Sequence, residues 1–300
     1  MRKLLVLGFV GLLAQLIDGS LGMAYGVTSS TLLLAVGVAP AAASAAVHFS
    51  EIGTSLVSGA SHHKLGNVDW RTVSILAVPG FVGAFAGATF LASLPGDEAK
   101  PWVATILLAL GVYVIWRFLM LGGRRPDFAG SPSPLFLAPM GLFGGALDAI
   151  GGGGWGPVGT TSLLSSGRLE PRKVIGSIDT SEFVVAVGGS LGFLLALGSQ
   201  GIDWGYALAL LAGGVVAAPI AAWLVRHLPA RVLGVGAGGL IVLTNSKTIL
   251  ETLGATGLQV GVVAAVVAVL WLTGIAWAVK QESIAARQRA EEPDLEPALG

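Results

Sequence analysis

The sequence has no cysteine and few charged residues. It contains 17 Lys and Arg and 17 Asp and Glu among 300 residues, so its formal net charge is zero. The lack of cysteine excludes disulfide bonds and thiol chemistry, and the balanced charge excludes the basic face that nucleic-acid binding requires. A serine nucleophile would need a partnered base, yet the sequence has no G-x-S-x-G elbow and no Ser/His/Asp arrangement. We therefore expect no enzymatic activity, no cofactor, no metal site and no nucleic-acid partner.

Apolar residues dominate what is present. They make up 54% of the chain against 11% charged residues, and the mean hydropathy is +0.80, whereas about a quarter of the residues of a soluble domain are charged. Several apolar segments reach the roughly 20 residues that cross a bilayer. Four shorter segments flank glycine-rich stretches. The sequence thus predicts an all-α, multi-pass protein of the cytoplasmic (inner) membrane, with segments near 4–17, 24–38, 41–61, 71–92, 101–121, 134–148, 155–166, 172–197, 203–225, 230–250 and 257–279.

Two stretches of the chain resemble each other. They are LIDGSLGMAYGVTSSTLLL, starting at Leu16, and ALDAIGGGGWGPVGTTSLL, starting at Ala146. Further along, Ser50 and Glu51 match Ser181 and Glu182, which indicates a duplication because rare residues recur in the same order. The pairs at constant spacing are Asp18 with Asp148, Gly22 with Gly152, Tyr25 with Trp155, Gly26 with Gly156, and Thr31 with Thr161.

The duplication and the basic residues together predict the organisation of the chain. We expect a first repeat over 1–121, a linker over 122–134, a second repeat over 135–250, an extra transmembrane helix over 251–279 and a disordered cytoplasmic tail over 280–300. Five segments in each repeat would place the later Lys and Arg clusters in the cytoplasm, and an odd number makes the repeats inverted. The alternative, a four-span unit repeated in parallel, would place the cluster from Arg168 to Lys173 outside.

The glycine runs predict helices that break within the membrane. Non-helical backbone at membrane depth is tolerated where it is buried in protein or lines a cavity, and the N-terminus of a new half-helix together with hydroxyl groups can hold an anion. Close helix packing is the alternative explanation of the glycines. The predicted substrate-binding residues are Gly22, Tyr25, Gly26, Thr28, Ser29, Thr31, Gly152, Gly153, Gly154, Trp155, Gly156, Thr160 and Thr161.

Carboxyl groups stand out within the apolar segments, since each ionised one facing lipid would cost about 2.5–3.5 kcal/mol. Asp18 and Asp148 either accept hydrogen bonds from the glycine loops or serve coupling. Glu51 and Glu182 are candidate proton carriers, because burial disfavours the charged form; hydrogen bonding between helices is the alternative. A titratable residue, His48 or Asp179, precedes each glutamate by three positions and lies on the same helix face, which suggests a proton relay. His62 and His63 are expected to anchor the chain at the membrane interface together with Trp70.

Four segments carry a resemblance to a known family. The stretches DAIGGGGWGP, DGSLGMAYG, SGASHHKLGNVDW and VVAAPIAAWLVRHLP make the chain similar to the sulfite exporter TauE/SafE family, the toluene sulfonate uptake permeases. This resemblance implies a secondary transporter of sulfite, sulfonates or other small sulfur-containing or organic anions. The carboxylates leave open a cation- or proton-coupled carrier of another solute, and a membrane scaffold is a third interpretation. The expected partners are a small anion, membrane lipid, a coupling proton or sodium ion, and a second copy of the chain in a homodimer.

Overall fold

The described chain is all-helical. The computed structural model describes residues 2–120, 130–224 and 230–291, and these form eleven α-helices and one short 3-10 turn, η1 (Ser199–Gly201). The predicted all-α class is confirmed. The helices are α1 (Arg2–Leu21), α2 (Tyr25–Ala35), α3 (Pro40–Lys64), α4 (Trp70–Ala92), α5 (Gly96–Leu119), α6 (Pro134–Gly151), α7 (Trp155–Ser166), α8 (Pro171–Leu197), α9 (Trp204–Leu224), α10 (Ala230–Thr252) and α11 (Gly257–Glu291).

Glycine-rich breaks separate α1 from α2 and α6 from α7. Gly22 and Gly152 end the two preceding helices in the left-handed region, with φ of 68° and 70°. A residue with a Cβ rarely adopts this conformation, so glycine ends a helix there at little cost. The chain then resumes as a short helix of 11 residues in α2 and 12 residues in α7. The predicted broken helices are therefore present in both halves of the chain.

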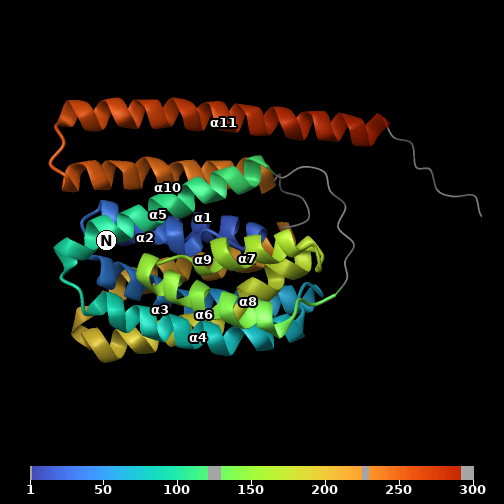
Figure 1. Ribbon diagram of the computed structural model, residues 1–300, viewed down its shortest axis with the longest axis horizontal. Helices are drawn as coiled ribbons and strands as arrows, with labels where there is room; N and C mark the ends of the chain where they lie inside the picture. The colour runs from blue at the N-terminus through green and yellow to red at the C-terminus, as the bar shows by residue number, and fades with distance from the viewer. Residues whose placement is uncertain (1, 121–129, 225–229, 292–300) are drawn as a thin grey trace, which may run out of the picture.

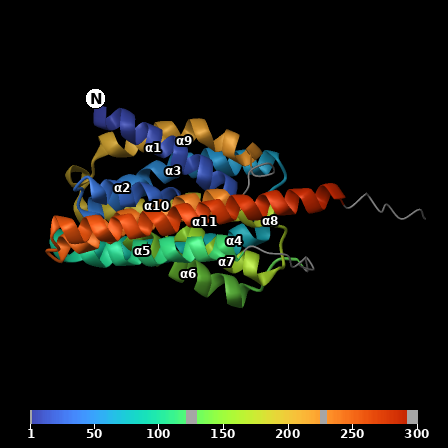
Figure 2. The ribbon, with the colours of Figure 1, turned by 90° about the horizontal axis from the view of Figure 1, so that it is seen from above.

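The two halves of the chain interlock. Helix α1 packs along α9, and α4 packs along α6, so the first helix of each half lies against the fourth helix of the other half. The long helices α3 and α8 contact each other and also pack on α9 and α4, respectively. Figure 1 shows this body as a bundle of roughly parallel and antiparallel helices, and Figure 2 shows the same pairing of α1 with α9 from above. The inverted orientation of the two repeats stays a prediction.

Seven of the helices are long and apolar enough to span a membrane: α1, α4, α5, α6, α8, α9 and α11. Helix α3 has 25 residues but is not among them. Its buried face carries Ser, His and Glu side chains, which lower its hydropathy without exposing polar groups to lipid. The protein thus spans the membrane, and its most polar long helix lies inside the bundle.

Helix α11 lies over α10 at the edge of the bundle (Figure 1). It continues to Glu291, so the disordered tail that we predicted from Lys280 onward is wrong for residues 280–291. The segment QESIAARQRAE is rich in Ala, Glu, Gln and Arg, which favour the helix even without an apolar face. Residues 292–300, residue 121 and most of the predicted linker, residues 122–129, lie outside the described residues.

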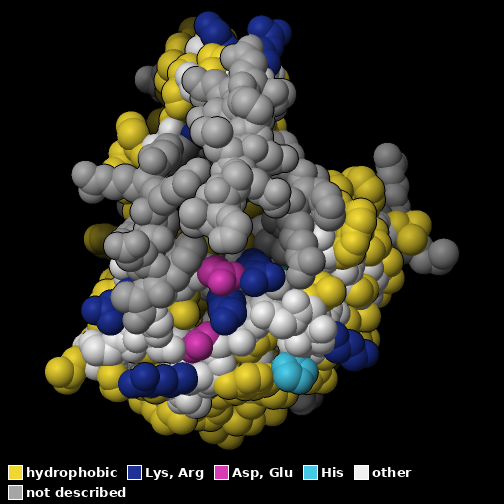
Figure 3. All heavy atoms as spheres, turned by 90° about the vertical axis from the view of Figure 1, so that its right-hand side faces the viewer, with side chains coloured by type: hydrophobic (Ala, Val, Ile, Leu, Met, Phe, Trp, Pro, Cys, Tyr) yellow, Lys and Arg dark blue, Asp and Glu magenta, His cyan; other side chains and the backbone are white. Residues whose placement is uncertain are grey.

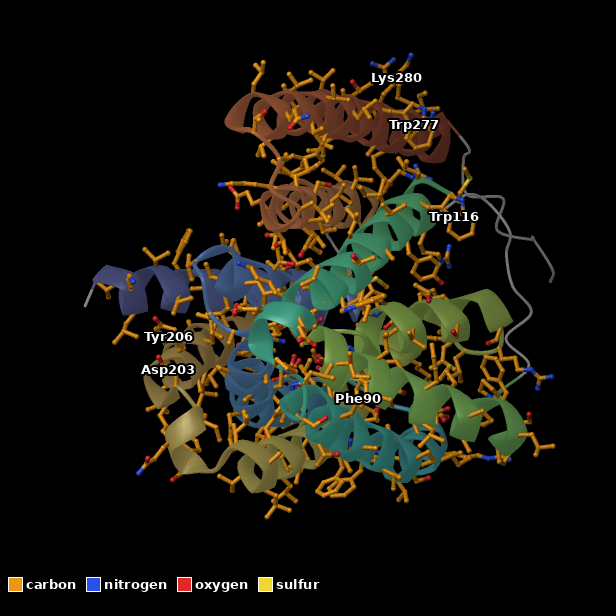
Figure 4. All side chains as sticks on the ribbon, turned by 60° about the vertical axis from the view of Figure 1, so that its left-hand side comes forward. Phe90, Trp116, Asp203, Tyr206, Trp277 and Lys280 are labelled. Atoms are coloured by element: carbon orange, nitrogen blue, oxygen red, sulfur yellow. The ribbon has the colours of Figure 1, made fainter. Side chains whose placement is uncertain are left out.

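The two ends of the bundle differ in their side chains. Figure 3 looks onto the end where α3 finishes and α8 begins, and Lys and Arg side chains gather around that face. Figure 4 shows Trp116, Trp277 and Lys280 on one side of the molecule, while Asp203 and Tyr206 lie on the opposite side. Aromatic and basic side chains at helix ends are typical of the two membrane interfaces.

Single-cysteine labelling tests the orientation of the repeats directly, since the chain has no cysteine of its own. Arg168 and Ser199 are exposed at the two ends of α8. With inverted repeats, Ser199→Cys reacts with a membrane-impermeant maleimide in intact cells, whereas Arg168→Cys reacts only after permeabilisation. Labelling of Arg168→Cys in intact cells would instead support the parallel four-span repeat.

Candidate functional site

Each half-helix is capped by the aspartate that precedes its break. Asp18 Oδ1 accepts a hydrogen bond from Tyr25 N at 3.1 Å. Asp148 Oδ1 accepts from Gly154 N at 2.6 Å and from Trp155 N at 2.9 Å. A carboxylate at a helix N-terminus satisfies free N–H groups and opposes the helix dipole. Both aspartates thus accept hydrogen bonds from the glycine-rich breaks, while their role in coupling stays a prediction. Their capping oxygens compete with any anion for the same N–H groups.

The two breaks contact each other across the centre of the molecule. Ser30 Oγ donates a hydrogen bond to Gly152 O at 2.6 Å, and Thr160 Oγ1 donates to Gly22 O. The backbones also meet directly, because a Cβ on Gly26 would lie 2.7 Å from Gly152 O. We call residues 22–31 and 152–161 the helix crossing. Its breaks exchange equivalent hydrogen bonds, so each satisfies a carbonyl group of the other.

Tyr25 and Trp155, both predicted to bind substrate, lie in the protein interior with 1% of their surface exposed. Tyr25 OH lies 3.0 Å from Ser50 Oγ on α3. Trp155 Nε1 donates to Ile178 O on α8 at 3.1 Å. Each aromatic side chain therefore ties a half-helix to the long helix that follows it in sequence.

Some hydroxyl groups of the helix crossing have hydrogen-bond partners, and others have none among the described residues. Thr31 Oγ1 accepts from Asn245 Nδ2, and Thr161 Oγ1 accepts from Tyr113 OH, at 2.8 Å and 2.7 Å. Asn245 and Tyr113 were not among the predicted site residues, although an amide within the apolar α10 is a usable sequence signal. Within residues 2–120, 130–224 and 230–291, the buried hydroxyl groups that have no hydrogen-bond partner include those of Thr28 and Ser29.

His48, Glu51 and Asp148 form a buried group that we call the first cluster. One ligand atom from each lies within 4.8 Å of the others, and His48 Nε2 is 3.3 Å from Asp148 Oδ2. His48 Nδ1 lies 2.9 Å from the carbonyl oxygen of Ser44 and can donate a hydrogen bond to it, which would leave the Nε2 lone pair facing Asp148. Neither carboxyl oxygen of Glu51 has a hydrogen-bond partner among the residues that the structure describes.

Asp18, Asp179 and Glu182 form the second cluster, with ligand atoms again within 4.8 Å of one another. Each cluster thus combines two residues of one long helix with the capping aspartate of the other half. These distances would allow a small cation to bind, although we expected no metal site. Two side chains of α3 contact the second cluster. His62 Nε2 lies 3.4 Å from Asp179 Oδ2, and Ser55 Oγ donates a hydrogen bond to Glu182 Oε2 at 3.0 Å.

His62 differs from its predicted place at the membrane interface. Its side chain is fully buried, whereas the neighbouring His63 stacks edge-on against Trp70 at 5.4 Å between ring centroids. The reason is its position on the buried face of α3. That face carries polar residues three and four positions apart, a spacing that places them on one side of a helix: Ser44, His48, Glu51, Ser55, Ser58 and His62.

The loop after α3 ties this polar face to the second half. Asp69 N donates to Ser177 Oγ at 2.8 Å, and Asp69 Oδ1 accepts from Thr72 N at 2.8 Å and from Ser131 Oγ at 3.0 Å. Partial burial alone would raise the pKa of Asp69, but these hydrogen bonds to its carboxylate hold the pKa below its usual value. The loop therefore carries a stable negative charge at the end of α3.

Comparisons with known proteins agree with this architecture. The model of the sulfite exporter TauE/SafE family matches residues 7–248. The "Probable membrane transporter protein YtnM" of Bacillus subtilis (strain 168) is 49% identical over 278 residues, which cover 92% of this chain and 92% of that protein. A "Probable membrane transporter protein" of Haemophilus influenzae is 27% identical over 144 residues, 48% of this chain and 52% of the other. No solved structure matches the chain.

Substitution of one glycine tests the contact between the breaks. We expect Gly26→Ala to lower the melting temperature, because its Cβ would meet backbone atoms at 2.7 Å and 2.8 Å, and overpacking costs about 1–3 kcal/mol. Gly261→Ala on α11 is the control, since a Cβ there meets nothing within 4 Å and alanine favours a helix. Equal melting temperatures for Gly26→Ala and the parent protein would contradict the direct contact.

Proposed function

Since the chain belongs to the sulfite exporter TauE/SafE family, a family of membrane transporters, we propose that it moves sulfite, an organosulfonate or a related small anion across the cytoplasmic membrane. The anion binds at the helix crossing, as in other transporters whose discontinuous helices hold the substrate. In the described conformation the two breaks touch each other. Binding therefore requires them to separate on one side of the membrane at a time.

The observation that carries this proposal is the pair of unpartnered hydroxyl groups on Thr28 and Ser29. A buried polar group without a partner costs free energy, and the acceptor oxygens of an oxyanion can accept hydrogen bonds from such hydroxyl groups. No Lys or Arg whose exposure is described is buried. The proposed site is thus built from neutral donors, which suits a small, hydrated anion that must be released again.

Proton uptake by Glu51 supplies the proposed coupling. Both of its carboxyl oxygens are buried without hydrogen-bond partners, and one lies close enough to meet a Cβ on Gly26 at 2.9 Å. An ionised carboxylate at this place repels an anion at the helix crossing, whereas a protonated carboxyl does not. His48, one turn earlier, lies between Glu51 and Asp148 in the proposed proton path.

The carboxylates also favour a second candidate, a carrier in which a cation rather than an anion is the cargo. Five buried acidic residues face two buried histidines in the two clusters and their surroundings. Flux assays with labelled sulfite separate the candidates: a cation carrier would leave sulfite outside the vesicles under every gradient.

Two adjacent serines test the anion site. Ser29→Ala removes an unpartnered hydroxyl, so we expect a melting temperature equal to or above that of the parent protein and roughly tenfold weaker sulfite binding, the loss of about one hydrogen bond. Ser30→Ala is the matched control, because it removes the hydrogen bond to Gly152 O and should lower stability by about 0.5–1.5 kcal/mol. Sulfite binding by Ser29→Ala at parental affinity would place the site elsewhere.

The coupling is tested by Glu51→Gln, which keeps the shape of the side chain in a permanently neutral form. In proteoliposomes, parental transport should fall as rising pH removes the proton from Glu51. The Glu51→Gln protein should still bind sulfite but lose this dependence on pH. If its pH profile equals that of the parent, Glu51 is structural and does not couple transport to protons.

A further inference from the structure

The two clusters occupy equivalent places in the two halves but differ in charge. His48 and Glu51 on α3 correspond to Asp179 and Glu182 on α8, because Ser50 and Glu51 align with Ser181 and Glu182. The first cluster therefore has two carboxyl groups and one imidazole. The second has three carboxyl groups, and its only imidazole partner in the described chain is His62. It carries one acidic group more than the first.

The side chains around the second cluster are also more polar than those around the first. Opposite His48, α8 presents Gly189, where a Cβ would meet the imidazole, and Phe193, whose ring lies 5.7 Å from it edge-on. The corresponding positions of α3 are Ser58 and His62, and Ser58 Oγ donates to Asp179 Oδ2. The first cluster is thus lined by hydrocarbon on this side, while the second is lined by oxygen and nitrogen atoms.

Asp179 also has an oxygen without a partner. Its side chain is 1% exposed, and no donor in the described part of the chain reaches Oδ1. A buried carboxylate oxygen without a proton or cation beside it is strongly unfavourable. Glu51 and Asp148 of the first cluster have unpartnered carboxyl oxygens as well, but the second cluster combines such an atom with three carboxyl groups. This combination favours a positive charge at the second cluster.

We propose that the second cluster is a sodium-ion site, with carboxylate oxygens of Asp18, Asp179 and Glu182 as ligands. Ligand atoms within 4.8 Å of one another suit one ion whose oxygen ligands lie about 2.3–2.6 Å away, the range known for the similarly sized calcium ion. An all-oxygen set selects hard cations. A single positive charge offsets the one acidic group by which this cluster exceeds the first.

The site would couple the two halves of the chain. Asp18 stands just before the break between α1 and α2, whereas Asp179 and Glu182 belong to α8. A bound ion therefore holds a broken helix of one half against the long helix of the other. This inference extends the proposed transport cycle by naming a coupling ion, but the binding of sodium is measured without any anion.

Thermal unfolding of the full-length protein in detergent tests the site. At constant ionic strength, replacing choline by sodium should raise the melting temperature saturably, by roughly 2–6 °C, whereas potassium should not. Asp179→Asn should abolish this shift, and Glu251→Gln, which removes an exposed carboxyl group of α10 outside both clusters, is the control that keeps it. A parent protein without a sodium-specific shift, or one that responds only to calcium or magnesium, overturns the proposal.

A second variant, which replaces residues of the second cluster by their counterparts from the first, tests the site if Asp179→Asn does not fold. Asp179→His combined with Ser58→Gly copies His48 and Gly189 into the second cluster, so the protein should fold and lose its response to sodium. A sodium shift that persists in this double variant or in Asp179→Asn refutes the site. Failure of sulfite transport alone would leave the sodium shift intact, so the two proposals fail separately.

Discussion

The contact between the two chain breaks is the constraint on which the rest of the structure depends. Backbone groups inside a membrane must find partners within the protein. Each break satisfies its N–H groups through its own aspartate, Asp18 or Asp148, and a carbonyl group through a hydroxyl of the other break. Neither break is complete alone, and α1 and α6 accordingly pack against helices of the opposite half.

Local features of the sequence were enough to predict the chain breaks. The side-chain contacts within the clusters depend on packing between residues far apart in the sequence. The glycine runs and the duplication predicted broken helices, and the spacing of His48 and Glu51 placed them on one face. The sequence could not show that Asp148, rather than Asp18, meets His48, because α1 and α6 exchange places between the halves. His62 was misplaced for a related reason: its burial depends on α8 presenting Asp179, a contact between residues far apart in sequence.

The capping aspartates weaken the attraction of the half-helix N-termini for an anion. The positive end of a helix dipole attracts anions, and two such ends meet at the helix crossing. Both are already opposed by carboxylates, and three further acidic side chains are buried nearby. An anion would therefore enter a negative environment unless protons or cations accompany it. For the anion transport that we propose, coupling to a proton or another cation would remove this repulsion.

The clusters lie where cation binding could affect the separation of the two breaks. Each cluster joins a long helix of one half to the capping aspartate of the other, so both lie at the interface that must open when the breaks separate. A ligand shifts a conformational equilibrium only through its different affinities for the two states. The cation that we propose would be held by residues of both halves, so it would stabilise the closed arrangement, and separating the halves would disperse its ligands. In that proposal, release of the cation and opening of the helix crossing are the same physical event.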